Sequence, residues 1–203
     1  KNRVPITKVW TWDAARLPWD PSRLDNQNVG VPVVYRIMND GQSGLGAFTM
    51  WGGKARVFQD DGRGGTIFLG EDTTELIPVG GKMELYIGDS RDIVVTQRKM
   101  RDQQINIRRN KDNNIVLYDT DEIITAKIEN FKDSPAVLTM IQHIPGEWEM
   151  IECNMTYEKQ DASTLKFEIA LPARQGDKPA VAELTMHYQR KNVRPIFTPG
   201  RRR

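Results

Sequence analysis

Alternation of apolar and polar residues with a period of two runs through most of this chain and constrains its fold more than any other feature. In "KMELYIGD", Met83, Leu85 and Ile87 would face one side of a strand and Glu84 and Tyr86 the other, which is the spacing of a half-buried β-strand. The same alternation predicts strands in "VPVVYRIMND", "KARVFQ", "GTIFLGE", "RDIVVTQRKM", "QQINIRR", "EIITAKIEN", "AVLTMIQHI", "EWEMIEC", "STLKFEIALPA" and "AVAELTMHYQRK".

These short segments, each bounded by Gly, Pro, Asn or Asp, predict an all-β fold: an antiparallel β-sandwich, built as one extended or two successive sandwich-like subdomains, with almost no helix. One capped helical turn is expected in "DAARL", which Pro18 would end. The polar stretch "RRNKDNN" indicates a hairpin tip or a subdomain boundary. We therefore expect an N-terminal strand and connector over residues 1–30, a first β subdomain over 31–110, a second, immunoglobulin-like sandwich over 111–193, and a basic disordered tail over 194–203.

The sequence Gly-Gly-Lys occurs twice, in "MWGGKARVF" and "VGGKMELYI", and resembles the end of a phosphate-binding loop. Such a loop needs a glycine five residues before the Gly-Lys pair, Ser or Thr after the lysine, and a helix that follows. Here Phe48 and Leu76 stand at the first position, Ala55 and Met83 at the second, and a strand pattern follows each lysine. The repeat is therefore interpreted as a glycine entry into a strand.

Composition limits the classes of function. The chain has 203 residues, 38% of them hydrophobic and 28% charged, with a formal net charge of +2. No apolar run approaches the roughly 20 residues of a transmembrane helix, and part of the small basic excess lies in the terminal "GRRR", so no nucleic-acid partner is expected. The single cysteine, Cys153, is flanked by apolar residues, which favours a buried, unreactive thiol.

Few residues suggest a catalytic or metal-binding role. His143 and His187 each lie within a predicted strand, where a hydrogen-bonded sheet histidine is favoured over a metal ligand. The acidic segment "GEDTTE", residues 70–75, is interpreted as a solvated turn, because it lacks the alternating ligands of a calcium loop. No catalytic motif is found and no cofactor or metal is expected, although paired Asp and Glu residues of a glycoside hydrolase would leave no local signature.

Three tryptophans near the start of the chain, Trp10, Trp12 and Trp19, are the candidate recognition residues. Trp10 and Trp12 would share one face of a strand. An exposed aromatic face binds sugars or partner proteins, whereas the same face turned inward would close an edge of the core. Further along the chain, Trp148 follows a turn at Pro145-Gly146 and is expected to anchor the core.

The order of motifs resembles the C-terminal β domain of a bacterial family described as mucoidy-inhibitor-A-like, a domain of unknown function. The resemblance covers about residues 31–193, with one departure at Met50-Trp51-Gly52. It rests on Gly53, Lys54, Arg56, Val57 and Phe58; Phe68 to Asp72; Pro78, Gly80, Leu85, Gly88, Asp92 and Val94; Glu129, Asn130, Lys132, Asp133, Pro135 and Val137; and Gly146, Trp148, Tyr157, Asp161, Ala162, Thr164, Phe167 and Leu171 to Ala173.

This resemblance implies a periplasmic or otherwise extracytoplasmic bacterial protein, of which the chain would be a fragment lacking an N-terminal β region and a coiled coil. It implies no reaction. Together with the residues, it predicts a non-catalytic binding or structural module whose partner is a protein or another cell-envelope component. A carbohydrate-binding module, or a hydrolase of envelope carbohydrate that uses Asp and Glu pairs, is the alternative. Oligomeric state is not indicated.

Overall fold

The structure, a computed structural model, describes residues 4–15 and 30–195, and all its regular elements are β-strands. The predicted all-β, mostly antiparallel sandwich class is confirmed. The strands are β1 (Thr7–Asp13), β2 (Val31–Met38), β3 (Gly53–Asp60), β4 (Thr66–Thr74), β5 (Lys82–Ser90), β6 (Ile93–Arg109), β7 (Ile115–Asn130), β8 (Ala136–His143), β9 (Glu147–Cys153), β10 (Glu158–Lys159), β11 (Thr164–Leu171) and β12 (Ala180–Val193).

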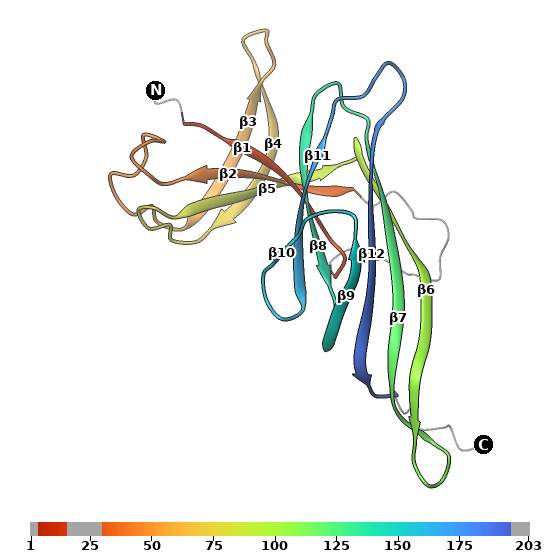
Figure 1. Cartoon of the computed structure of the whole chain (residues 1–203). Coiled ribbons are helices and arrows are strands. Elements are labelled where there is room, and N and C mark those ends of the chain that lie inside the picture. Colours follow the sequence, from red (N-terminus) through yellow and green to blue (C-terminus); the bar gives the residue numbers. More distant parts are fainter. Residues whose placement is uncertain (1–3, 16–29, 196–203) are drawn as a thin grey trace, which may run out of the picture.

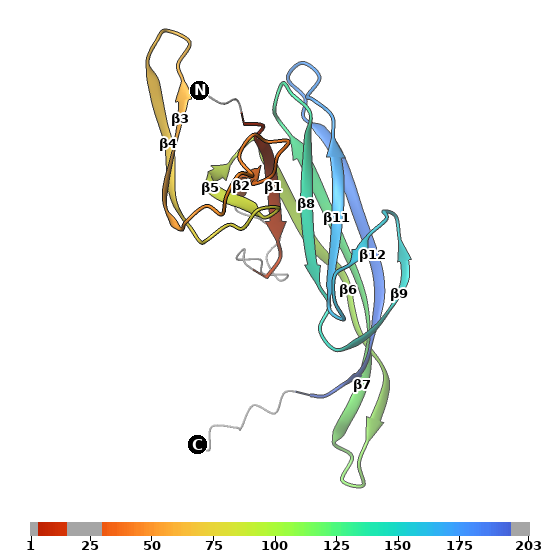
Figure 2. The same ribbon diagram turned by 90° about the vertical axis from the view of Figure 1, so that its left-hand side faces the viewer.

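The strands form three sheets (Figure 1). A six-stranded sheet has the order β10-β11-β8-β1-β2-β5, a four-stranded sheet has the order β6-β7-β12-β9, and β3 and β4 form a hairpin of their own. Figure 2 shows β8 and β11 in one layer beside β6, β7 and β12 in the other, with the β3–β4 hairpin standing apart. The two larger sheets are therefore the layers of the sandwich.

β1 joins two parts of the six-stranded sheet that come from distant parts of the chain. Its first residues pair antiparallel with β2, from Thr7 opposite Arg36 to Trp10 opposite Val33. From Trp10 opposite Leu138 onward it pairs with β8, and this pairing is parallel. The strand pair β2–β5 and the strands β8, β11 and β10 thus belong to one sheet only through β1.

One hydrophobic core lies between the two layers. The six-stranded sheet contributes Trp10, Trp12, Val31, Val33, Leu138, Met140, Leu165, Phe167, Ile169 and Leu171, and the four-stranded sheet contributes Ile93, Val95, Ile124, Ala126, Ile128, Leu184, Met186 and Tyr188. Alternate residues of each strand point inward, as the period-two pattern predicts. The core thus includes residues from both sides of the predicted boundary at residue 110.

Strand pairing crosses that boundary as well. The segments "RDIVVTQRKM" and "QQINIRR", predicted as two strands, belong to the single long strand β6. β6 pairs with β7 from Ile93 opposite Asn130 to Arg109 opposite Ile115, with register shifts on the way. The polar residues between them form the hairpin tip, where Asn113 has a φ of 61°, so of the two readings of "RRNKDNN" the hairpin tip is the one observed.

Both Gly-Gly-Lys sequences lie at the start of a strand, as predicted. β3 begins at Gly53 and β5 at Lys82. Gly80 has a φ of 83°, which favours glycine. At Gly52 glycine is favoured because there is little space for a side chain: a Cβ there would lie 2.9 Å from the carbonyl oxygen of Thr74.

Candidate binding site

Trp10 and Trp12, two of the three candidate recognition residues, are buried in the core with 7% and 4% of their surface exposed. Of the two interpretations of this aromatic face, the one turned inward to the core is therefore observed for these two residues, and the exposed recognition face is not. The inward face of β1 carries them because β1 lies inside the six-stranded sheet, directly over the four-stranded layer. Trp19, the third, lies outside the described residues.

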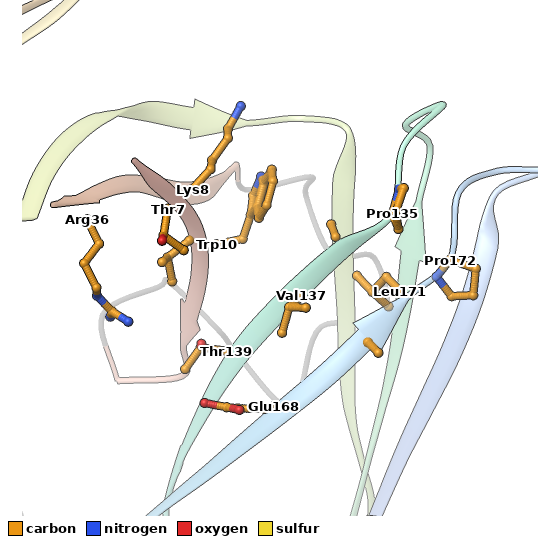
Figure 3. A pocket seen from close by; sticks show the side chains of 13 residues that line it. Thr7, Lys8, Trp10, Arg36, Pro135, Val137, Thr139, Glu168, Leu171 and Pro172 are labelled. Atoms are coloured by element: carbon orange, nitrogen blue, oxygen red, sulfur yellow. The ribbon is translucent and has the colours of Figure 1, made fainter. Parts of the chain in front are cut away.

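The structure shows a groove beside β1 that the sequence did not predict. It has a volume of ≈ 590 Å³ and lies between β1 on one side and β8 and β11 on the other (Figure 3). Its walls are mostly apolar and include Val9, Pro135, Ala136, Val137, Ala170 and Leu171. Ligand pockets commonly have volumes of about 300 to 1,000 Å³ and apolar walls, so the groove has the size and lining of a binding site.

The groove exists because β1 and β8 pair over only part of their length. Their register begins at Trp10 opposite Leu138. Before this point β1 pairs with β2, and the first residues of β8 pair with β11. Pro135 has no N–H to continue the ladder, and the two strands diverge toward it. Figure 3 shows Thr7 on β1 facing this gap and Val137 across it on β8.

Two lysines lie beside the Trp10 ring, and one of them, Lys8, also lines the groove. The Nζ atom of Lys8 is 5.1 Å from the centroid of the Trp10 ring, and the Nζ atom of Lys132 is 5.4 Å from it. Neither ammonium forms an ion pair within the described residues; Lys8 also lies 6.0 Å from the centroid of the Tyr35 ring. Partial burial and then the charge of Lys132 lower the pKa of Lys8. In addition, the buried Nε1 of Trp10 has no hydrogen-bond acceptor.

Each histidine has a carboxylate partner, in agreement with the prediction of hydrogen-bonded sheet histidines. The Nε2 of His143 lies 2.9 Å from Asp13 Oδ1, and the Nε2 of His187 lies 2.8 Å from Asp121 Oδ1. The two histidines lie on β8 and β12, in different sheets. No group of three or more His, Cys, Asp or Glu side chains arranged to hold a metal ion occurs in residues 4–15 and 30–195.

A network of charges lies where β6, β7 and β12 run beyond the apolar core. On the inward face, buried Glu122 accepts hydrogen bonds from Lys99, Thr120 and Tyr188. Burial opposes ionisation of Glu122, but the hydrogen bonds from Lys99 and Thr120 hold its pKa below the usual range. Burial, followed by the charge of Glu122, raises the pKa of Tyr188.

On the opposite face of the same strands, Asp121 is bound by His187 and Arg101. The hydrogen bond from His187, followed by that from Arg101, lowers the pKa of Asp121 to about 2. The carboxyl groups with shifted pKa values in the described part of the chain are all shifted down. The network is a set of ion pairs that extends the sheet.

Three other expectations have clear outcomes. The acidic segment at residues 70–75 was predicted as a turn, but most of it belongs to β4, where Glu71 pairs with Lys54 and Arg56. Trp148 packs against the core and donates to the Ala162 carbonyl, as expected of a core anchor. Cys153 is partly buried, and burial raises the pKa of its thiol.

Sequence reasoning missed the groove and the pair of lysines beside Trp10. Lys8 and Lys132 are separated by most of the chain and meet only because β1 pairs with β8. No local pattern indicates a parallel pair between the first strand and the eighth. The nearest signal in the sequence was the pair Trp10 and Trp12. It drew attention to β1, which borders the groove, but it did not indicate on which side of the sheet the groove lies.

Comparisons with models of protein families, with curated proteins and with solved structures give no match. No helix suited to crossing a bilayer occurs among the described residues.

Proposed function

We propose that this chain is a non-catalytic binding module of a bacterial cell-envelope protein, and that it binds its ligand in the groove between β1 and β8. The observation that carries the proposal is the combination of an apolar groove of ≈ 590 Å³ with Lys8, a lining residue that forms no ion pair within 4 Å among the described residues. The envelope location follows from the sequence resemblance.

The chemistry of the groove indicates the kind of ligand. Val9, Val137 and Leu171 offer apolar contact, and apolar contact area supplies most of the affinity in such a site. The ammonium of Lys8 favours an anionic group at the β1 end. Two other charged residues of the lining are already paired, Arg36 with Glu84 and Glu168 with Lys166. A ligand with an apolar body and one anionic group therefore fits best.

The test uses 1-anilinonaphthalene-8-sulfonate, which has an aromatic body and a single negative charge, as a fluorescent probe. Val137→Glu places a carboxylate in the groove wall and is expected to weaken probe binding at least about tenfold, equivalent to roughly 1.4 kcal/mol. Val181→Glu is the matched control, because Val137 and Val181 are 52% and 54% exposed but only Val137 lines the groove.

A second pair of variants tests the charge. Lys8→Met should weaken binding by up to about fivefold, because an exposed ion pair contributes no more than about 1 kcal/mol. Lys159→Met is its control, since Lys159 lies 4.5 Å from the ring centroid of Trp148, away from the groove. Equal binding by Val137→Glu and Val181→Glu, with both variants folded by circular dichroism, would show that the groove is not the binding site.

A further inference from the structure

The β3–β4 hairpin leaves one strand edge without a partner. β3 pairs with β4 and with no other strand in the described part of the chain. β4 lies beside β5, where Asp72 Oδ2 accepts a hydrogen bond from the Tyr86 N–H, so β3 is the outer strand of the hairpin (Figure 2). Half of the backbone N–H and C=O groups of an outer strand point away from its neighbour and are available for pairing.

Two of the usual protections of an outer strand, proline and a bulge, are missing from β3, although it carries the charged residues Lys54 and Arg56. Proteins commonly interrupt such edges with proline or with a bulge, but β3 has no proline, and the extra residue of the β3–β4 bulge, Leu69, belongs to β4. Phe58 and Phe68 form a ring pair with centroids 5.4 Å apart, and both are 55% exposed. The edge is thus regular, accessible and next to an apolar surface.

Charge is unevenly distributed along the hairpin. On the face of β3 that carries Lys54 and Arg56, both cations share the single carboxylate of Glu71, whereas Asp72 lies opposite Ala55 on the other face. Near its tip Asp60 and Asp61 bind backbone N–H groups of the turn, and neither forms an ion pair within the described residues. Two hairpins placed antiparallel would bring Lys54, near the base of one, beside Asp60, near the tip of the other.

We propose that two copies of this chain associate by antiparallel pairing of their β3 strands about Val57. This register places Lys54 opposite Asp60 of the second copy, Ala55 opposite Gln59, and Arg56 opposite Phe58. Each contact occurs twice, because a two-fold axis through Val57 relates the copies. Opposite charges and a cation beside an aromatic ring are both favourable cross-strand pairs.

Symmetry and charge select this register. A two-fold axis normal to the sheet leaves each side chain on the same face of the sheet in both copies. Residues that oppose each other across the two strands must also share a face, so the axis must be centred on a residue of β3 and not between two residues. An axis through Arg56 would oppose two arginines, which is unfavourable. An axis through Phe58 would pair only residues 56 to 60, whereas an axis through Val57 pairs residues 54 to 60, nearly the whole strand.

The first experiment is sedimentation velocity over a range of protein concentrations. The wild type should show a reversible monomer–dimer equilibrium. Lys54→Asp and Asp60→Lys should each raise the dissociation constant at least about tenfold, because each reverses both copies of the ion pair. The double variant should associate more tightly than either single variant. Lys82→Asp, the same charge change on β5, should dimerise like the wild type.

The second experiment leaves the charged residues in place, since the introduced lysine at position 60 cannot accept the hydrogen bond that Asp60 receives from Gly62. In a Cys153→Ser background, Val57→Cys lies on the two-fold axis and should form an intermolecular disulfide under mild oxidation. Gln59→Cys, which faces Ala55 of the second copy, should form far less. A wild type that stays monomeric, or equal cross-linking by the two variants, would overturn the proposal.

Discussion

Individual charged residues stabilise the part of the four-stranded sheet that extends beyond the apolar core. Asp121 is the clearest case, because it receives hydrogen bonds from His187, Arg101 and Gln189 and is almost fully buried. Its carboxylate is bound only when ionised, so the folded state holds its proton less tightly than the unfolded chain does. The stability of the protein therefore depends on pH through this residue.

The pH range of this effect follows from the direction of the shift. The pKa of Asp121 is lowered to about 2 from the ordinary value of 3.8. A lowered carboxyl pKa gives stability that is fully present above the unfolded value and is lost as pH falls toward the folded value. Asp121→Asn should therefore reduce the fall in melting temperature between about pH 4 and pH 2.

Thermal unfolding followed by circular dichroism at a series of pH values would measure this effect. Asp177→Asn, a change at an exposed residue of the turn between β11 and β12, serves as the control. If Asp121→Asn and the control show the same pH dependence as the wild type, Asp121 does not contribute to acid sensitivity.

Single elements of this fold are held in place by asparagine side chains as well as by strand ladders. Asn39, fully buried after the end of β2, donates from Nδ2 to the carbonyl oxygens of Phe48, Ile77 and Pro78. Its own backbone bonds to Gly80 and Gly81, just before β5. One side chain thus joins two segments that have no regular secondary structure.

Asn39→Ala should lower the free energy of unfolding by about 2 kcal/mol, because it leaves buried carbonyl groups without a donor. Urea unfolding followed by fluorescence would measure the change. Asn154→Ala is the control: Asn154 also bonds to backbone groups, of Glu183 and Thr185, but it is exposed, so a smaller loss is expected. Equal losses would mean that burial of Asn39 is not what matters.

The elements could be predicted from the sequence more reliably than their neighbours in space. Alternation in "KMELYIGD" and the other segments reports which strand face is buried, and the structure buries Leu85 as expected. The acidic segment of β4 was mistaken for a turn because Glu71 is charged; its two cationic partners lie on the adjacent strand. The parallel pair β1–β8, and with it the groove, depends on contacts across most of the chain, which local patterns do not contain.

At the scale of the whole molecule, the shared core argues against two independently folding halves. Ile93 lies in the predicted first subdomain and Leu184 in the second, yet both belong to one core cluster. Ile93→Ala and Leu184→Ala should each lower the free energy of unfolding by about 2 to 5 kcal/mol. Each variant should still unfold in a single transition, because neither half has a core of its own.

Hydrogen exchange with urea unfolding would measure this cooperativity. Both variants should lose protection in β2 and in β7 together, whereas the exposed control Ile67→Ala in the β3–β4 hairpin should have little effect on either strand. Two separate transitions, one for residues 31–110 and one for 111–193, would instead show that the two parts unfold independently.

The place of β1 inside the sheet also has a consequence for biosynthesis. During translation β1 leaves the ribosome long before its parallel partner β8, since Trp10 lies opposite Leu138. At a synthesis rate of about 5 to 20 residues per second, this interval lasts roughly 6 to 25 seconds. Throughout it, two indole rings that the finished protein hides are accessible to chaperones and to other nascent chains.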